Sequence, residues 1–368
     1  MAATGGYFVY VGCYTRNGRR GHGNAEGISV CRLNPETSGL ELASVATEPI
    51  NPSFLTLHPS KRFLYSVNET HETEGQIGGA VCAFAVDPST GGLTYLNKQS
   101  SHGVGPCHVS VEQTGRFALV ANYQSGSVAM LPIQSDGSLG SASDFHQHNG
   151  SSVNPQRQEG PHAHSINVDP SNRFALVPDL GMDKVMVYRL DLENGKLVPN
   201  DVPWVTLAPG SGPRHLDFHP NHRWVYVINE IASTLTVFDY AGDRGSLREI
   251  QTVATLPSDF SGSSTCADVH VHPSGRLVYG SNRGHDSIAI FAIDEATGRM
   301  TPVGHESTGG KTPRNFAVNA GGTFLWAANQ GTDNIVHYRI DGTSGKLTPT
   351  GQVTASPTPV CLKIARLP

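Results

Sequence analysis

The sequence predicts an all-β fold, a seven-bladed β-propeller built from four-stranded antiparallel blades. Three observations predict it: a strand–turn–strand pattern recurs about every 50 residues, each copy continues into a third and a fourth short strand, and the two chain ends resemble two parts of one further copy. Four strands in a repeat of this length are typical of propeller blades. We therefore expect residues 1–368 to form a single propeller domain.

The copies align on one position in their first turn. In the third copy, residues 164–168 alternate polar and apolar, residues 169–172 break the chain and residues 173–177 are apolar, as in two strands joined by a turn. A third strand follows at residues 184–188, and a glycine-containing turn at 195–197 leads into the fourth. The aligned position carries Arg62, Arg116, Arg173, Arg223, Arg276 and Thr323, separated by 54, 57, 50, 53 and 47 residues.

The two chain ends are expected to share the seventh blade. Residues 358–364 resemble the first strand of a copy with nothing after it, whereas residues 7–14 resemble a second strand and residues 27–31 a third. Closing the ring in this way removes exposed sheet edges. The longest irregular segment, residues 135–160, is polar and rich in Gly and Ser. It is interpreted as either a solvated loop between blades or a partial lid over a site.

Composition narrows the functional classes. The net charge is -5, 15% of residues are charged, and basic residues do not cluster, which argues against nucleic-acid binding. No apolar run approaches the ~20 residues of a membrane span, and the first residues lack the pattern of a secretory signal, so a cytoplasmic protein is expected. The six cysteines form no CxxC pair and are interpreted as buried, reduced thiols.

Two sets of recurring polar residues are interpreted as structural. One is an Asn or Asp at the end of each second strand, expected to bond neighbouring backbone; its members are Asn68, Asn122, Asp179, Asn229, Asn282 and Asn329. The other is a histidine before proline in the first turn, at His58, His219 and His272. His162 and His164, like His270 and His272, lie two apart, but no third ligand is evident, so neither a metal nor another cofactor is expected.

The copies differ most where the first strand begins and the second ends. The first strand of each propeller blade lines the central channel, so these positions lie around one end of that channel. Burying charged groups there costs free energy unless they form ion pairs or bind a ligand. The residues could therefore be a ring of salt bridges that stiffens the channel, or a functional site. The convergence of the whole set on one face favours a functional site. The variable positions carry Ser53, Cys107, His164, Arg214, Ala267 and Arg314; Phe54, His108, Ser165, His215, Asp268 and Asn315; and Glu69, Tyr123, Leu180, Glu230, Arg283 and Gln330.

The chemistry of these residue types suggests a reaction. Arg214 and Arg283, with Arg314 beside them, can bind an anionic group or stabilise an oxyanion. His164 and Glu230 are the natural proton-transfer groups, and the residues alone do not decide which of them is the base.

Several motifs resemble one known family. The segments GPHAHSINVDP with PDLG, GPRHLDFHP with VYVINE, YGSNRGHDSIAIF and FLWAANQGTDNI resemble the seven-bladed lactonases of the bacterial 6-phosphogluconolactonase type, a family that also includes fungal carboxy-cis,cis-muconate cyclases. The resemblance spans nearly the whole chain. It implies an active site of one histidine, two arginines and one glutamate, which fall on His164, Arg214, Arg283 and Glu230. Asp268 stands where family members more often carry Glu.

Three functions are therefore considered. The first is hydrolysis of a sugar-acid lactone, 6-phosphogluconolactone or a related aldonolactone, by general-base attack of water with arginine stabilisation of the oxyanion. The second is a lactonising cyclase of the carboxymuconate type, and the third a non-enzymatic propeller scaffold. A small lactone is the only expected partner, with no nucleic acid or membrane, and a monomer or weak homodimer is expected. The predicted substrate-binding residues are His162, His215, Asp268, His285, Arg314, Asn315 and Gln330.

Overall fold

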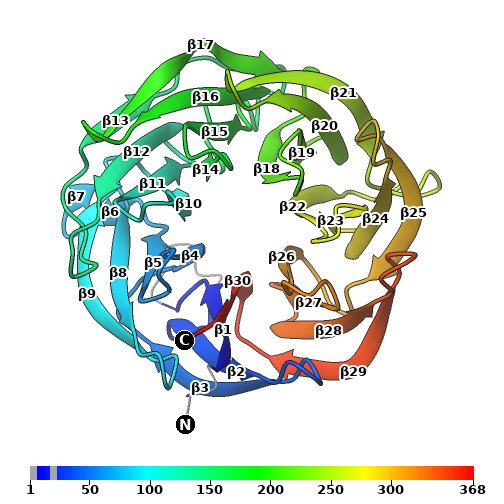
Figure 1. Cartoon of the computed structure of the whole chain (residues 1–368), viewed down its shortest axis with the longest axis horizontal. Coiled ribbons are helices and arrows are strands. Elements are labelled where there is room, and N and C mark those ends of the chain that lie inside the picture. The colour runs from blue at the N-terminus through cyan, green and yellow to red at the C-terminus, as the bar shows by residue number, and fades with distance from the viewer. Residues whose placement is uncertain (1–5, 17–22) are drawn as a thin grey trace.

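The computed structural model describes residues 6–16 and 23–368. Seven four-stranded antiparallel sheets are arranged as blades around a common axis, and each presents its first strand to the centre (Figure 1). The regular secondary structure of the described residues is entirely strand. The predicted seven-bladed propeller is therefore confirmed.

Six blades use consecutive strands, innermost first. The first three are β4 (Leu55–Leu57), β5 (Phe63–Asn68), β8 (Ala80–Val86) and β9 (Leu93–Ser100); β10 (Pro106–Val111), β11 (Phe117–Asn122), β12 (Ser127–Pro132) and β13 (Asp144–Gln147); and β14 (Asn167–Val168), β15 (Phe174–Asp179), β16 (Lys184–Asp191) and β17 (Lys196–Thr206). The next three are β18 (Pro213–Phe218), β19 (Trp224–Asn229), β20 (Thr234–Ala241) and β21 (Ser246–Ala254); β22 (Thr265–Val271), β23 (Leu277–Arg283), β24 (Ser287–Ile293) and β25 (Met300–Ser307); and β26 (Pro313–Val318), β27 (Phe324–Asn329), β28 (Asn334–Ile340) and β29 (Leu347–Ala355). A small hairpin, β6 (Glu72–Thr73) and β7 (Gln76–Ile77), stands apart.

The seventh blade joins the two ends of the chain, as predicted. Its innermost strand is β30 (Pro359–Arg366), and β1 (Tyr7–Cys13), β2 (Ile28–Leu33) and β3 (Leu40–Ala46) follow outward. β1 and β30 pair antiparallel along their length, from Tyr7 opposite Arg366 to Cys13 opposite Pro359. Figure 1 shows the blue and red ends of the chain side by side in this blade.

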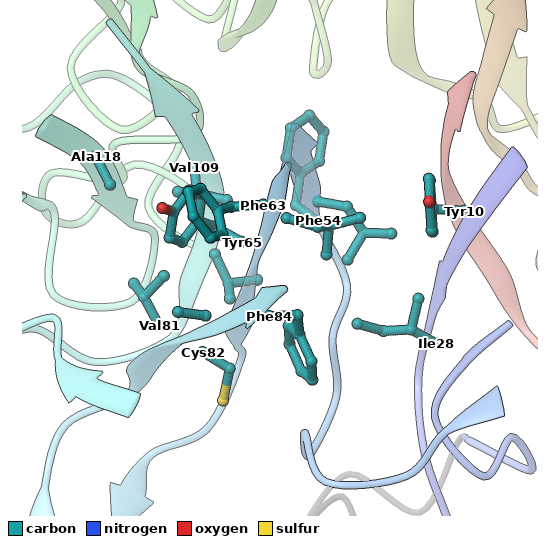
Figure 2. Packing of buried hydrophobic residues seen from close by; sticks show 14 of the residues in the cluster. Tyr10, Ile28, Phe54, Phe63, Tyr65, Val81, Cys82, Phe84, Val109 and Ala118 are labelled. Atoms are coloured by element: carbon teal, nitrogen blue, oxygen red, sulfur yellow. The ribbon is translucent and has the colours of Figure 1, made fainter. Parts of the chain in front are cut away.

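The hydrophobic core lies between neighbouring blades. One cluster combines Tyr10 of β1, Tyr65 of β5 and Val109 of β10, which belong to three successive blades (Figure 2). Second strands such as β5 and β19 are buried at every residue, because both faces of each sheet are covered by the adjacent blades. This explains why the second strand of each copy reads as an unbroken apolar run rather than as an alternating one.

A repeated joint connects each blade to the next. The aligned arginine of the first turn stacks on the aromatic ring that follows it, as Arg223 does on Trp224 with 5.5 Å to the ring centroid. Gly298 of the next blade packs on that same ring, and its carbonyl accepts a 2.8 Å hydrogen bond from the Tyr226 hydroxyl. Gly298 has φ +73, and a Cβ there would lie 2.6 Å from the Trp224 ring, so only glycine fits. Equivalent hydrogen bonds join Tyr10 to Gly91, Tyr65 to Gly137 and Tyr279 to Gly345.

The closing blade has serine at the glycine position of this joint. Ser38 has φ 67, and its carbonyl accepts a 3.0 Å hydrogen bond from Trp326 Nε1 of the preceding blade. The Ser38 hydroxyl is buried without a hydrogen-bond partner among the described residues. The position therefore carries both a strained backbone and an unsatisfied polar group.

Replacing Ser38 with glycine is expected to raise the free energy of unfolding by about 1 kcal/mol. Left-handed backbone costs an L-residue roughly 1–2 kcal/mol, and the greater flexibility of glycine in the unfolded chain offsets roughly 0.4–1 kcal/mol of the gain. Chemical denaturation of Ser38→Gly against the parent protein measures the difference. Gly298→Ala is the matched control and should destabilise the protein, and a Ser38→Gly variant less stable than the parent would contradict this interpretation of the joint.

The two recurring polar sets have the structural roles that were predicted for them. His58, His219 and His272 each bond the carbonyl of a glycine in the next blade's turn, at 3.0, 2.7 and 2.8 Å. The Asn and Asp residues at the ends of the second strands form hydrogen bonds with neighbouring segments of the chain. For example, Asn282 Nδ2 donates to the Thr255 carbonyl at 2.8 Å. These contacts hold turns and strand ends in place.

The structure settles two further expectations from the sequence. All six cysteines are free and buried, as predicted, and burial raises the pKa of each thiol, so they are poor nucleophiles. Residues 135–160 are not wholly irregular, because β13 forms the outer strand of its blade within them. In the described part of the chain, no helix has the length and apolar character needed to cross a membrane.

Candidate active site

The innermost strands are irregular at the ends that face the candidate site. In β18, Pro213 pairs with Asn229 and His215 with Ile228, so Arg214 between them is an extra residue without a partner. The same shift occurs at Cys107 in β10 and at Arg314 in β26. Such β-bulges redirect side chains. At β18 the bulge lets the consecutive residues Arg214 and His215 contact each other.

Glu230, directly after β19, is the centre of the cluster. Its Oε2 lies 2.9 Å from Arg214 Nε and 2.9 Å from Arg283 Nη2, and its Oε1 lies 2.5 Å from Arg157 Nη2. Burial raises the pKa of this carboxyl, but Arg283, Arg214 and Arg157 lower it more, to well below the ordinary range. Glu230 is therefore a carboxylate whose two oxygens already accept from arginines.

Arg214 is held on one side and retains donors on the other. Nε donates to Glu230, and Nη1 lies 3.1 Å from His215 Nε2 and donates to the Ala267 carbonyl. Of the five N–H groups of an arginine, these contacts with described residues use three and leave the two on Nη2. Burial, with Arg314 and Arg283 nearby, lowers the pKa of Arg214 to about 10, so it is still charged at neutral pH.

Arg283, the last residue of β23, is arranged in a similar way. Its Nη2 donates to the Cys266 carbonyl at 2.6 Å as well as to Glu230. Its Nε is buried and has no hydrogen-bond partner among the described residues. An unsatisfied buried donor is costly, so this N–H suits an acceptor oxygen on a bound substrate.

His164 lies beside this arginine cluster, just before β14. Its Nε2 is 3.9 Å from Glu230 Oε2, and its ring packs edge-on against Tyr123 and His215. Burial lowers the pKa of His164 well below 6.5, and Arg214, His215 and Arg314 lower it further. His164 is therefore a neutral imidazole at neutral pH.

These groups together suit acyl chemistry. A neutral imidazole can take a proton from water, and guanidinium N–H groups beside it can bind an oxygen that becomes negatively charged. Across residues 6–16 and 23–368, no three His, Cys, Asp or Glu side chains are grouped as metal ligands would be.

The comparisons with known proteins agree with this chemistry. The model of the seven-bladed β-propeller lactonase family matches residues 8–364. The chain belongs to this lactonase family. A 6-phosphogluconolactonase of Bacillus subtilis (strain 168) is 38% identical over 310 residues, which are 84% of each protein, and one of Formosa agariphila is 35% identical over 79% of this chain and 81% of its own. The solved structure of a periplasmic gluconolactonase of Pseudomonas aeruginosa has a TM-score of 0.91 at 34% identity, covering 99% of this chain and 100% of that one. Family membership makes the protein a lactone hydrolase.

The structure of this lactonase brings several of the predicted substrate-binding residues to the cluster. His215, Asp268 and Asn315 form a buried hydrogen-bonded chain that ends on Arg214. Arg314 lies over the Tyr14 ring, 5.8 Å from its centroid. His162 stacks on Tyr123 with ring centroids 4.7 Å apart.

Two other predicted substrate-binding residues, His285 and Gln330, have contacts with residues outside this cluster. His285 bonds Ser287 Oγ at 2.6 Å, and its ring contacts Phe260 and His305. Gln330 lines a separate cavity of about 410 Å³ with residues that include Asn24 and Asp333. Among the described residues, neither has a hydrogen bond, ion pair or ring contact with the four predicted catalytic residues. Of the residues seven places after the aligned position, Glu230 and Arg283 contact each other, whereas Gln330 lines this cavity.

Sequence reasoning did not identify Arg157. It lies within residues 135–160, its side chain is 38% exposed, and it bonds the Tyr123 hydroxyl at 3.2 Å as well as Glu230. The comparison of copies could not find it, because this insertion occurs in one copy only. The only sequence feature that pointed to Arg157 was its place in residues 135–160, which were interpreted as a possible partial lid over a site.

His270, whose side chain is 33% exposed, is expected to make this lactonase less stable as the pH becomes alkaline. Burial lowers the pKa of His270, but Asp268 and Asp217 raise it more, to about 10. This folded-state pKa is above the ordinary 6.5, so the stabilisation is complete below pH 6.5 and is lost as the pH rises towards 10. Chemical denaturation between these pH values should show falling stability in the parent and a flatter profile in His270→Asn. Identical profiles would contradict the charged pairing.

Proposed function

We propose that this lactonase hydrolyses a sugar-acid lactone, with 6-phosphogluconolactone preferred to unphosphorylated aldonolactones. The names of the relatives in Bacillus subtilis and Formosa agariphila support this substrate class. The observation that carries the proposal is a neutral imidazole, His164, beside two arginines that keep N–H donors free while Glu230 is fully engaged.

In the proposed reaction, His164 takes a proton from a water molecule as that water adds to the lactone carbonyl. The carbonyl oxygen becomes an oxyanion, which accepts hydrogen bonds from Nη2 of Arg214 and Nε of Arg283. Collapse of the tetrahedral intermediate breaks the bond from the carbonyl carbon to the ring oxygen. The imidazolium returns its proton to that leaving oxygen, and the product is the open-chain hydroxy acid.

The geometry favours His164 over Glu230 as the base. Both oxygens of Glu230 accept from guanidinium groups, which stabilise its charged form and make it a weak proton acceptor. Glu230 instead positions both arginines and, 3.9 Å from His164 Nε2, stabilises the imidazolium that forms during the reaction. We therefore assign the role of base to His164, a choice that the residue types alone left open.

The charge of the cluster favours an anionic substrate. Its four guanidinium groups face three carboxylates, those of Glu69, Glu230 and Asp268, an excess of one positive charge. An excess of positive charge raises the local concentration of anions and their rate of association. A phosphate on the sugar chain is the group that the proposed substrate offers to it. The four guanidinium groups belong to Arg157, Arg214, Arg283 and Arg314.

A substrate panel monitored by acid release across pH tests the proposal. The panel compares 6-phosphogluconolactone with gluconolactone, each corrected for spontaneous opening, and follows carboxymuconate by its ultraviolet absorbance. We expect the highest kcat/KM for the phosphorylated lactone and no cyclisation. Wild-type turnover of every lactone by both His164→Ala and Glu230→Gln would reject the proposed site, and turnover of carboxymuconate alone would favour the cyclase.

A further inference from the structure

A buried chain of side chains runs from Arg214 to the carboxylate of Asp268. Arg214 Nη1 lies 3.1 Å from His215 Nε2, and His215 Nδ1 lies 2.8 Å from Asp268 Oδ1. Arg214, His215 and Asp268 are all less than 9% exposed. The chain crosses from β18 to β22, two adjacent blades.

The contacts determine which nitrogen of His215 carries the proton. Arginine only donates hydrogen bonds, so Nε2 must be the unprotonated acceptor from Arg214 and Nδ1 must carry the hydrogen. That hydrogen is donated to the Asp268 carboxylate. Burial, followed by Arg214, lowers the pKa of His215 to about 4, in agreement with a neutral ring.

Asp268 itself is held by groups from several blades. Its Oδ2 accepts from His270 Nε2 at 3.2 Å and from Asn315 Nδ2, and its backbone N–H donates to Ser281 Oγ at 3.0 Å. Asn315 is held in turn, because its Oδ1 accepts a 2.7 Å hydrogen bond from the backbone N–H of Leu362 in β30. Both carboxylate oxygens therefore already accept from protein donors, which leaves Asp268 poorly suited to bind substrate directly.

The ring of His215 is also restrained sterically. It packs edge-on against Phe54, His108 and His164, with centroid separations of 5.7, 5.6 and 5.4 Å. Because these contacts prevent the His215 ring from rotating, its hydrogen bond to Asp268 fixes where its other nitrogen meets Arg214.

We propose that Asp268 is a positioning residue that acts through His215. It selects the Nδ1–H tautomer, which leaves Nε2 to accept from Arg214 Nη1 and so directs Arg214 Nη2 towards the lactone carbonyl. The inference rests on the proposed function, because it assigns that role to Arg214. This positioning role replaces the role in direct substrate binding that the sequence suggested for Asp268.

The tautomer can be measured without any assay of activity. Long-range ¹H–¹⁵N correlation spectra of the full chain, with His215 assigned by its absence from His215→Phe, should show the Nδ1–H form in the parent. Asp268→Leu, of similar size but without the carboxylate, should lose that preference. Asp268→Glu should keep it, since the carboxylate is retained. Finding the Nε2–H tautomer in the parent would overturn the proposal even if no variant folds.

Kinetics provide the second measurement. Asp268→Leu should lower kcat by about 10²-fold with a smaller change in KM, because small misplacements of a catalytic group cost about that much, and Asp268→Glu should recover most of the loss. His219→Phe is the matched control: His219 bonds the Gly275 carbonyl at 2.7 Å, so this variant should lose stability and keep kcat.

The outcomes separate the two proposals. If Arg214→Ala keeps its kcat, the proposed function has failed. If Arg214→Ala loses kcat while Asp268→Leu and His215→Phe keep it, the function stands and the positioning role of Asp268 is wrong.

Discussion

Replacing Arg214 with alanine is expected to lower kcat for lactone hydrolysis by about 10²–10³-fold, with a smaller effect on KM. Loss of a single donor to an oxyanion typically costs this much, and Arg214 is already oriented by Glu230 and His215 before substrate binds. The donors on Nη2 face no competing partner among the described residues. Steady-state kinetics by acid release, at a pH where spontaneous opening of the lactone is slow, measure the change.

Two variants make this test specific. Arg214→Lys keeps the charge but not the planar set of donors, so it should recover only part of the activity. Arg248→Ala removes an exposed arginine that pairs with Asp239 at 2.8 Å on an outer strand, and it should keep the parent kcat. A rise in KM at unchanged kcat for Arg214→Ala would mean that Arg214 binds the ground state and does not stabilise the oxyanion.

The second large effect is expected at His164. His164→Ala should lower kcat by about 10²–10⁴-fold, the usual contribution of a positioned general base. The low pKa of His164 means that the imidazole is already unprotonated at neutral pH. The parent should therefore be active throughout the neutral range, and activity should fall only in acid, as His164 becomes protonated.

The comparison with Glu230 decides between the two candidate bases. His58→Ala is the control for loss of a histidine; its ring bonds the Gly115 carbonyl at 3.0 Å between blades, so stability should fall and kcat should not. If His164→Ala retained most of its kcat and Glu230→Gln lost it without loss of stability, Glu230 would be the base.

The fold could be predicted from the sequence because each blade repeats the same pattern of turn and strand residues. Turn residues, apolar second strands and the aligned arginine recur at similar spacing, so errors in one copy are corrected by the others. The closing blade was predicted for a related reason, since residues 7–14 and 358–364 are incomplete alone and complete together. Ser38, by contrast, shows its strain only through its φ and its partner Trp326.

The candidate site was predictable only where it follows the repeat. His164 and Arg214 occupy one aligned position and Glu230 and Arg283 another, at the same ends of neighbouring blades, so aligning the copies was enough to group them. Arg157 comes from an insertion without counterparts, and nothing in the alignment of the copies connects it with Glu230. The direction of hydrogen bonding through His215 was also hidden, because donors and acceptors are distinguished by geometry and not by spacing.

The blade shared by the two termini has a consequence for how this enzyme matures. β30 comes last in chain order among the described strands, and its Leu362 N–H fixes Asn315, which in turn holds Asp268. The chain that orients Arg214 is thus completed by the same step that closes the ring. If Asp268 has the proposed positioning role, catalytic competence depends on full closure of the ring, and a chain without β30 would lack both.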